Sequence, residues 1–145
     1  MYTLDECEPH HIFQVGCNLR QADQDECFAG GFENPVEALM WSVELSDESC
    51  TVFLDGEPVG IWGFSDEYDG SCVVWTVGTD RLVENPLALH KASILFRDAL
   101  FERFDTLRNT VFKENLVHLE WLRRLGAEFT ETEDPAFLEF EITKP

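Results

Sequence analysis

The sequence is short of basic residues. Its 145 residues include 10 Lys and Arg against 29 Asp and Glu, which gives a formal net charge of -19 at pH 7. Residues 1–80 hold 17 of the acidic residues and one basic residue, Arg20, whereas residues 81–145 hold 12 acidic and nine basic residues. A surface with so few cations repels phosphate backbones and anionic lipids. We therefore expect no direct binding to nucleic acid and no binding to a membrane.

Three further absences narrow the class of protein. No run of about 18 or more apolar residues is present, so no segment resembles a membrane-spanning helix. The first residues are acidic and lack the basic and then apolar pattern of a signal peptide, which predicts a soluble intracellular protein. The five cysteines are widely spaced and form no CxxC pair. This spacing argues against a disulfide framework and against a zinc site, so we expect no metal.

What is present suffices for a folded domain. The length and the 44% of hydrophobic residues fit a single domain over residues 1–145, in which residues 1–10 form an acidic leader. The residue patterns predict the order strand, two helices, three strands, helix, strand, helix and two strands. The predicted strands cover residues 11–19, 50–54, 58–64, 72–77, 106–112, 128–133 and 137–142. The predicted helices cover residues 20–29, 34–45, 85–104 and 115–125.

The boundaries of these elements have local signals. Asn34-Pro35 and Asn85-Pro86 each place an N-cap residue before a proline at the first helical position. Asp55-Gly56 favours the positive backbone dihedrals of a tight hairpin turn. The continuous apolar run Cys72–Val77 predicts a strand in the middle of the sheet that is buried on both faces.

The order of elements, together with the spacing of Asn115, His118 and Gly126, resembles the GNAT (Gcn5-related N-acetyltransferase) fold. Leu19–Asp25 is similar to the opening strand-to-helix signature of those proteins. The resemblance implies an α/β (α+β) class with a mixed central sheet of about six to seven strands flanked by about four helices. It covers nearly the whole chain.

The last third of the chain has a narrower resemblance. The stretches Glu102–Asn109, Leu125–Ala127 and Phe140–Lys144 resemble the small GNAT-like internal virion proteins of autographivirus-type podoviruses. This resemblance implies a role in phage assembly, a location in the virion or in the cytoplasm of the infected cell, and no established catalysis.

The resemblance also indicates where coenzyme A would bind. A GNAT holds the pyrophosphate on backbone N–H groups of a glycine-containing loop, where the central strand runs into the long helix. The corresponding run Thr79–Leu87 contains no glycine, and it places Asp80 and Glu84 where the anion would sit. Pro86 removes a further donor. We therefore expect no cofactor; if acetyl-coenzyme A did bind, the resemblance implies that three residues would contact it, namely Val77, Arg81 and Asn115.

No residue stands out as catalytic. Many GNAT enzymes use a tyrosine seven residues after the motif asparagine as general acid, and that position is Leu122 here. Glu67 and His118 are candidate general bases, with a solvated loop carboxylate and a packed helix residue as the alternatives. Asn115, which directly precedes a helix, is also placed to be an ordinary N-cap. Whether the protein is an enzyme stays open at this point.

Three functions are compatible with these patterns. The first is a phage assembly or virion protein with a degenerate coenzyme A site, whose acidic N-terminal half contacts a basic protein partner. The second is an N-acetyltransferase that acts on a cationic amine. The third is an acidic DNA mimic that inhibits a host enzyme. The sequence leaves open the partner, the oligomeric state and whether the acidity serves solubility alone.

Overall fold

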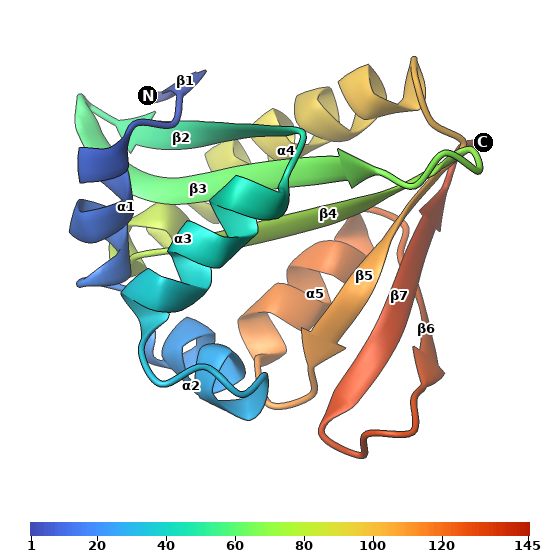
Figure 1. Ribbon diagram of the computed structural model, residues 1–145. Helices are drawn as coiled ribbons and strands as arrows, with labels where there is room; N and C mark the ends of the chain where they lie inside the picture. The colour runs from blue at the N-terminus through green and yellow to red at the C-terminus, as the bar shows by residue number, and fades with distance from the viewer.

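A seven-stranded sheet forms the centre of the computed structural model, which describes all residues Met1–Pro145 (Figure 1). The strand order is β1-β2-β3-β4-β5-β7-β6, and all neighbours are antiparallel except β4 and β5, which are parallel. The strands are β1 (Tyr2–Glu6), β2 (Glu48–Leu54), β3 (Glu57–Asp66), β4 (Ser71–Gly78), β5 (Thr106–Phe112), β6 (Glu128–Glu131) and β7 (Phe137–Thr143). This mixed sheet confirms the predicted fold class.

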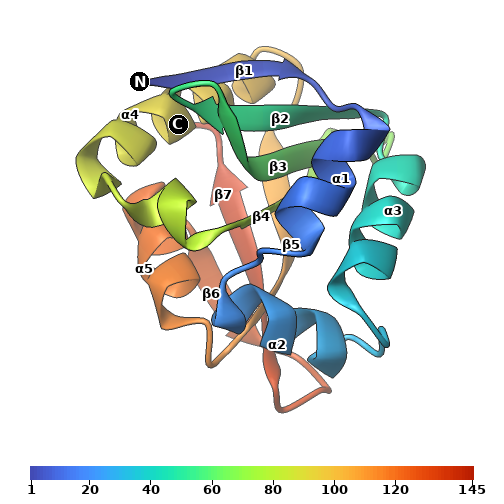
Figure 2. The same ribbon diagram turned by 90° about the vertical axis from the view of Figure 1, so that its left-hand side faces the viewer.

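Helices cover both faces of the sheet, as Figure 2 shows from the side. Their bounds are α1 (Pro9–Gly16), α2 (Gln21–Ala29), α3 (Pro35–Leu45), α4 (Pro86–Phe101) and α5 (Leu116–Arg124), with a short 3-10 helix η1 (Asp80–Val83) before α4. On one face, Ile61 of β3 packs with apolar side chains of α1 and α3. On the other face, Trp62 and Phe64 of the same strand pack toward α4. The sheet therefore separates two apolar layers.

The local boundary signals are confirmed. The Asn34 side chain accepts a hydrogen bond from the Glu37 N–H at 2.8 Å, and the Asn85 side chain accepts one from the Ala88 N–H at 3.2 Å. Asp55 and its neighbouring glycine have positive φ values of 50° and 84° in the turn between β2 and β3. These contacts involve residues close in sequence, so the sequence alone predicts them.

The prediction of a strand over residues 11–19 is wrong, because residues 9–16 form α1. Pro9 occupies the first turn, and the Glu8 N–H donates to His11 Nδ1 at 3.0 Å in a capping box. The buried side chains Ile12 and Val15 recur with helical spacing and face α3. Gly16 lets α1 approach α3 closely, since a Cβ at this position would lie 2.9 Å from Val36 Cγ2.

The sequence predicts no strand in residues 1–10, whereas Tyr2–Glu6 forms β1 at the edge of the sheet and pairs with β2. Most of its side chains are exposed, so its apolar pattern gives no strand signal. The Tyr2 hydroxyl donates to the Leu82 carbonyl at 2.8 Å and ties the strand to η1. Long-range main-chain pairing therefore makes this strand.

The prediction that β4 is buried on both faces holds only at its ends. Val73–Val77 is half-buried, because β4 pairs with β5 over three residues only, Ser71–Val73 against Thr106–Arg108. Beyond them the two strands diverge, which Figure 1 shows as a V between β4 and β5. This gap positions the candidate site.

None of the helices is both long and apolar enough to cross a membrane.

Candidate functional site

Side chains bridge the V-shaped gap between β4 and β5 where strand pairing stops. Near the narrow end, the Val74 carbonyl accepts a hydrogen bond from Asn109 Nδ2 at 2.8 Å. At the wide end, the Gly78 N–H donates to Asp23 Oδ2 at 3.0 Å, and the Gly78 carbonyl accepts from the Arg20 N–H at 2.9 Å. Groups from β5 and from the start of α2 therefore satisfy backbone atoms of β4 that a neighbouring strand would otherwise pair.

A buried polar network closes the wide end of the gap. Arg20 Nη2 donates to Asn115 Oδ1 at 2.8 Å and lies 3.4 Å from Asp23 Oδ1, to which Asn115 Nδ2 donates at 3.0 Å. Arg20 is 8% exposed, Asp23 is 4% exposed and Asn115 is fully buried. Charged groups at this depth persist only when they are paired and hydrogen-bonded. The network thus joins α2, the end of β4 and the start of α5.

The interpretation of Asn115 as an ordinary N-cap is wrong. Its side chain makes no capping hydrogen bond to α5. Its amide oxygen and nitrogen are instead both used by Arg20 and Asp23. Sequence reasoning gives the right helix start at this residue and the wrong partners, because the partners lie more than 90 residues away in the chain.

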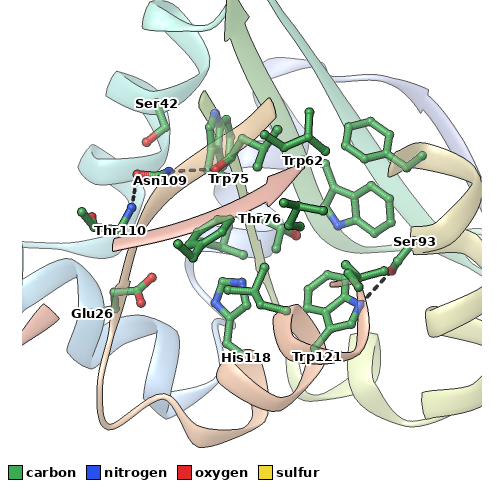
Figure 3. A pocket seen from close by; sticks show the side chains of 18 of the residues that line it. Glu26, Ser42, Trp62, Trp75, Thr76, Ser93, Asn109, Thr110, His118 and Trp121 are labelled. Carbon is green, nitrogen blue, oxygen red and sulfur yellow. Dashed lines mark hydrogen bonds between the residues drawn. The ribbon is translucent and has the colours of Figure 1, made fainter. Parts of the chain in front are cut away.

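A cavity of about 220 Å³ occupies the gap between these bridges (Figure 3). Its lining comes from both faces of the sheet, with Glu26 on one side and His118 and Trp121 on the other. Most of the lining is apolar. Two buried polar atoms in its wall have no hydrogen-bond partner, namely Trp62 Nε1 and Thr76 Oγ1.

A second cavity of about 510 Å³ adjoins the first on the side of α4 and α5. The two cavities share four lining residues, which are Thr76, Val77, His118 and Trp121. Its lining includes the apolar Leu116 and Val117, which are 71% and 55% exposed, and the charged Glu120 and Arg124. This groove lies beside the end of β4 and the start of α4, where the GNAT resemblance places coenzyme A.

The predicted site residues are only partly brought together. Val77 and His118 line both cavities. Arg81 lines neither cavity; it forms ion pairs with Glu57 and Glu84. Glu67 also lines neither cavity, because it precedes β4 at the narrow end of the gap, where it accepts a hydrogen bond from Arg108 Nη2 at 2.9 Å.

Two of the titratable side chains that line the cavity, His118 and Glu26, face it from opposite sides of the sheet (Figure 3). Burial lowers the pKa of His118 to about 4, so its imidazole is neutral at pH 7. Its ring lies against Trp121, with ring centroids 5.6 Å apart. Burial raises the pKa of Glu26 to about 7, although its carboxylate accepts a hydrogen bond from the Phe112 N–H at 2.7 Å.

Sequence reasoning missed Glu26. The one signal for it is local: Glu26 follows Asp23 by three residues, so the two acids share a face of α2. Nothing in the sequence indicates that this face turns toward the end of β5.

The segment between β4 and α4 does not fit a pyrophosphate. Pro86 has no N–H, and the Asn85 side chain already accepts the Ala88 N–H. The Leu82 N–H donates to the Thr79 carbonyl at 3.0 Å within η1, and the Glu84 N–H donates to the Arg81 carbonyl at 3.3 Å. Residue 86 therefore has no donor, and the N–H groups of Leu82, Glu84 and Ala88 are already used. The exposed carboxylates of Asp80 and Glu84 add negative charge beside this turn.

The general-acid position is apolar as well. Leu122 is 5% exposed and packs in the apolar cluster under α4 and α5. A side chain without a proton at this depth cannot protonate a leaving group.

One group of metal-ligating side chains lies apart from both cavities, at Glu8, His10 and His11. His11 Nδ1 accepts the Glu8 N–H and lies 2.8 Å from Thr51 Oγ1. The neutral His11 ring therefore carries its proton on Nε2, the atom that faces the Glu8 carboxylate. A metal bound to Nε2 would have to displace that proton, and in this structure Glu8 and His11 form the capping box at the start of α1.

Comparison with known proteins gives one relative in sequence and many in structure. No protein-family model matches the chain. The chain is 31% identical over 129 residues to the probable scaffold protein gp13 of Escherichia phage T7, a match that covers 82% of this chain and 90% of the relative.

Several of the structurally similar proteins are acetyltransferases. A GNAT-family acetyltransferase from Bacillus anthracis has a TM-score of 0.71 at 13% identity, covering 98% of this chain and 94% of its own. An acetyltransferase from Thermus thermophilus has a TM-score of 0.72 at 14% identity, covering 99% and 97%. The aminoglycoside acetyltransferase AAC(6')-Ib in complex with coenzyme A has a TM-score of 0.67 at 14% identity, covering 99% and 95%. The chain therefore has the GNAT fold.

Replacing Asn115 tests the buried network. Asn115→Ala removes one acceptor from Arg20 and one donor from Asp23 at a site without solvent, so we expect the free energy of unfolding to fall by about 2–4 kcal/mol. Asn85→Ala is the matched control, because it removes only an exposed helix cap and costs about 1 kcal/mol. Urea denaturation followed by circular dichroism measures both. Equal losses in the two variants would contradict the role of the network.

Glu26 makes stability depend on pH. Its folded-state pKa of about 7 lies above the ordinary 4.5, so the folded protein holds the proton more tightly than the unfolded chain does. The contribution of Glu26 to stability therefore falls as the pH rises from about 4.5 to about 7 and is constant above that range. Glu26→Gln is expected to remove this decline. The unfolding free energies of the wild type and the variant are measured at several pH values, and the difference between them is taken at each pH. The titration of His118 is common to both proteins and cancels in this difference. A difference that does not change with pH would refute the raised pKa of Glu26.

Proposed function

The chain belongs to the family of the probable scaffold protein gp13 of Escherichia phage T7, and from this membership we propose that it is a phage assembly protein that works through contacts with other proteins. The observation that carries the proposal is the extent of the match, which spans 82% of this chain and 90% of the relative. We place the protein in the virion or in the cytoplasm of the infected cell.

The geometry of the gap supports a function without acyl transfer. The first turn of α4 offers few free donors to a pyrophosphate, and Asp80 and Glu84 add negative charge beside it. Leu122 takes the position of the general acid. We therefore propose that the coenzyme A site is degenerate and that the fold now serves as a rigid platform for protein contacts.

A second candidate function is an N-acetyltransferase that acts on a cationic amine. The observation in its favour is the cavity between β4 and β5, where the Glu26 carboxyl and the neutral His118 imidazole face the same space. Either group could accept a proton from an amine. This candidate requires that acetyl-coenzyme A bind without the usual phosphate loop.

The first test is the presence of the protein in phage particles. Mass spectrometry of purified virions and of assembly intermediates from infected cells is expected to detect the chain at a constant ratio to the capsid protein. A non-structural phage protein of similar abundance serves as the control for contamination. Absence of the chain from both virions and intermediates would refute an assembly role.

The second test separates the two candidate functions. Ligand at 100 times its dissociation constant stabilises a protein by about 2.7 kcal/mol. We expect millimolar acetyl-coenzyme A to leave the melting temperature of this protein unchanged, while an active GNAT acetyltransferase melted in parallel shifts upward. A saturable upward shift of this protein would favour the acetyltransferase and contradict the degenerate site.

A further inference from the structure

Helix α3 is apolar on both of its sides. On the inner side, Ala38 and Leu39 are buried against the rest of the protein. On the outer side, Met40, Trp41 and Leu45 are 50%, 51% and 68% exposed. Adjoining large apolar side chains on an exposed surface with polar residues around them mark a site of protein contact. The outer side of α3 therefore presents large apolar side chains that nothing in this chain covers.

The exposed residues form one continuous strip. Helical spacing places Met40, Trp41 and Leu45 on the outer side together with Glu37 and Glu44, and all five are exposed. We name this strip the α3 face. Neither of its two carboxylates takes part in an ion pair. The apolar side chains of Met40 and Trp41 thus lie one helical turn from the unpaired carboxylates of Glu37 and Glu44. An exposed apolar patch with polar residues around it is typical of a protein interaction site.

The surroundings of the α3 face are also acidic. The only basic residue among residues 1–80 is Arg20, and the network described above uses it in the interior. The one cation that reaches the C-terminal side of α3 is Arg103, which pairs with Glu48. No basic side chain of α1, α2 or α3 is therefore available to neutralise this side of the molecule.

The α3 face is held in a fixed orientation. Asn34 caps the start of the helix, and at its end the Trp75 indole N–H donates to Ser46 Oγ at 2.7 Å. A surface that is already ordered loses less entropy when a partner binds.

We propose that the α3 face is a docking site for a basic amphipathic segment of a different protein, one that places apolar side chains over Trp41 and Met40 and Lys or Arg beside Glu37 and Glu44. This inference rests on the proposed function and names the chemistry of the partner. A second copy of this chain is a poor occupant, because it would set the same acids against each other with a net charge of -19 on each copy. Nucleic acid and anionic lipid are repelled for the same reason.

Site-specific crosslinking identifies the occupant. A photoreactive benzoylphenylalanine is placed at position 41 of the full chain in infected cells, and at position 95 as the control, since Leu95 is 73% exposed on α4, which covers the other side of the sheet. We expect a crosslink at position 41, about tenfold stronger than at position 95, to a peptide of another phage protein in which Lys and Arg outnumber Asp and Glu. A crosslink to a second copy of this chain, to an acidic peptide, or equally from both positions would overturn the proposal.

Variants of the α3 face distinguish this inference from the proposed function. Because the side chains are exposed, Met40→Ser with Trp41→Ser is expected to keep the melting temperature while reducing the chain in purified particles about tenfold or more, and Leu95→Ser is expected to leave its level unchanged. If the double variant melts early, Glu37→Lys with Glu44→Lys replaces it and is expected to give the same reduction. Wild-type chain missing from particles would refute the assembly role itself. Wild-type chain present and all variants incorporated equally would refute the α3 face alone.

Discussion

The buried hydrogen bonds between Arg20, Asp23 and Asn115 are the interaction on which the rest of the structure depends. The sheet splits between β4 and β5 after three paired residues, and such a split leaves backbone groups without strand partners. Asp23 supplies the missing acceptor to the Gly78 N–H and also binds Arg20 and Asn115. A single carboxylate thus connects α2, β4 and α5, and the low polarity around it makes each of these bonds costly to lose.

On the proposal that the coenzyme A site is degenerate, this arrangement explains how a GNAT fold can keep its gap without keeping its chemistry. The gap remains as a largely apolar cavity with Glu26 and a neutral His118 in its wall. The feature that a coenzyme needs most, a set of free backbone donors at the start of α4, is occupied by Asn85 and interrupted by Pro86. Strand divergence is a property of the whole sheet, whereas phosphate binding depends on a few residues of one turn, so the second can be lost while the first persists.

The same network shapes the outer surface. Arg20 is the one cation of residues 1–80, and because it is needed inside to balance Asp23, none is left for the exterior of α1, α2 and α3. The opposite side of the sheet differs, since α4 and α5 carry basic residues that pair with acids, such as Arg123 with Glu120. The molecule therefore has one mainly acidic side with exposed apolar residues and one mixed side. Such asymmetry favours a single orientation toward a basic partner.

Local features of the chain could be read from the sequence, because they depend on neighbouring residues. The caps Asn34 and Asn85 bind backbone N–H groups three residues away, and Asn85 starts the long helix α4. The turn at Asp55 follows from the positive φ values of Asp55 and Gly56. The resemblance of the element order gave the GNAT fold for the same reason, since the order is a linear property. Residues 9–16 are the exception, where a capping box and a proline at the start outweighed an apolar pattern taken for a strand.

The sequence by itself determined most of the elements, the fold class and the excess of acid. Only the tertiary structure decided that β1 exists, that Asn115 binds Arg20 and Asp23 instead of capping α5, and that Glu26 faces a cavity. Each of these depends on residues far apart in the chain. Their energies come from burial and from pairing with distant groups, and no pattern of neighbouring residues records which distant groups will meet.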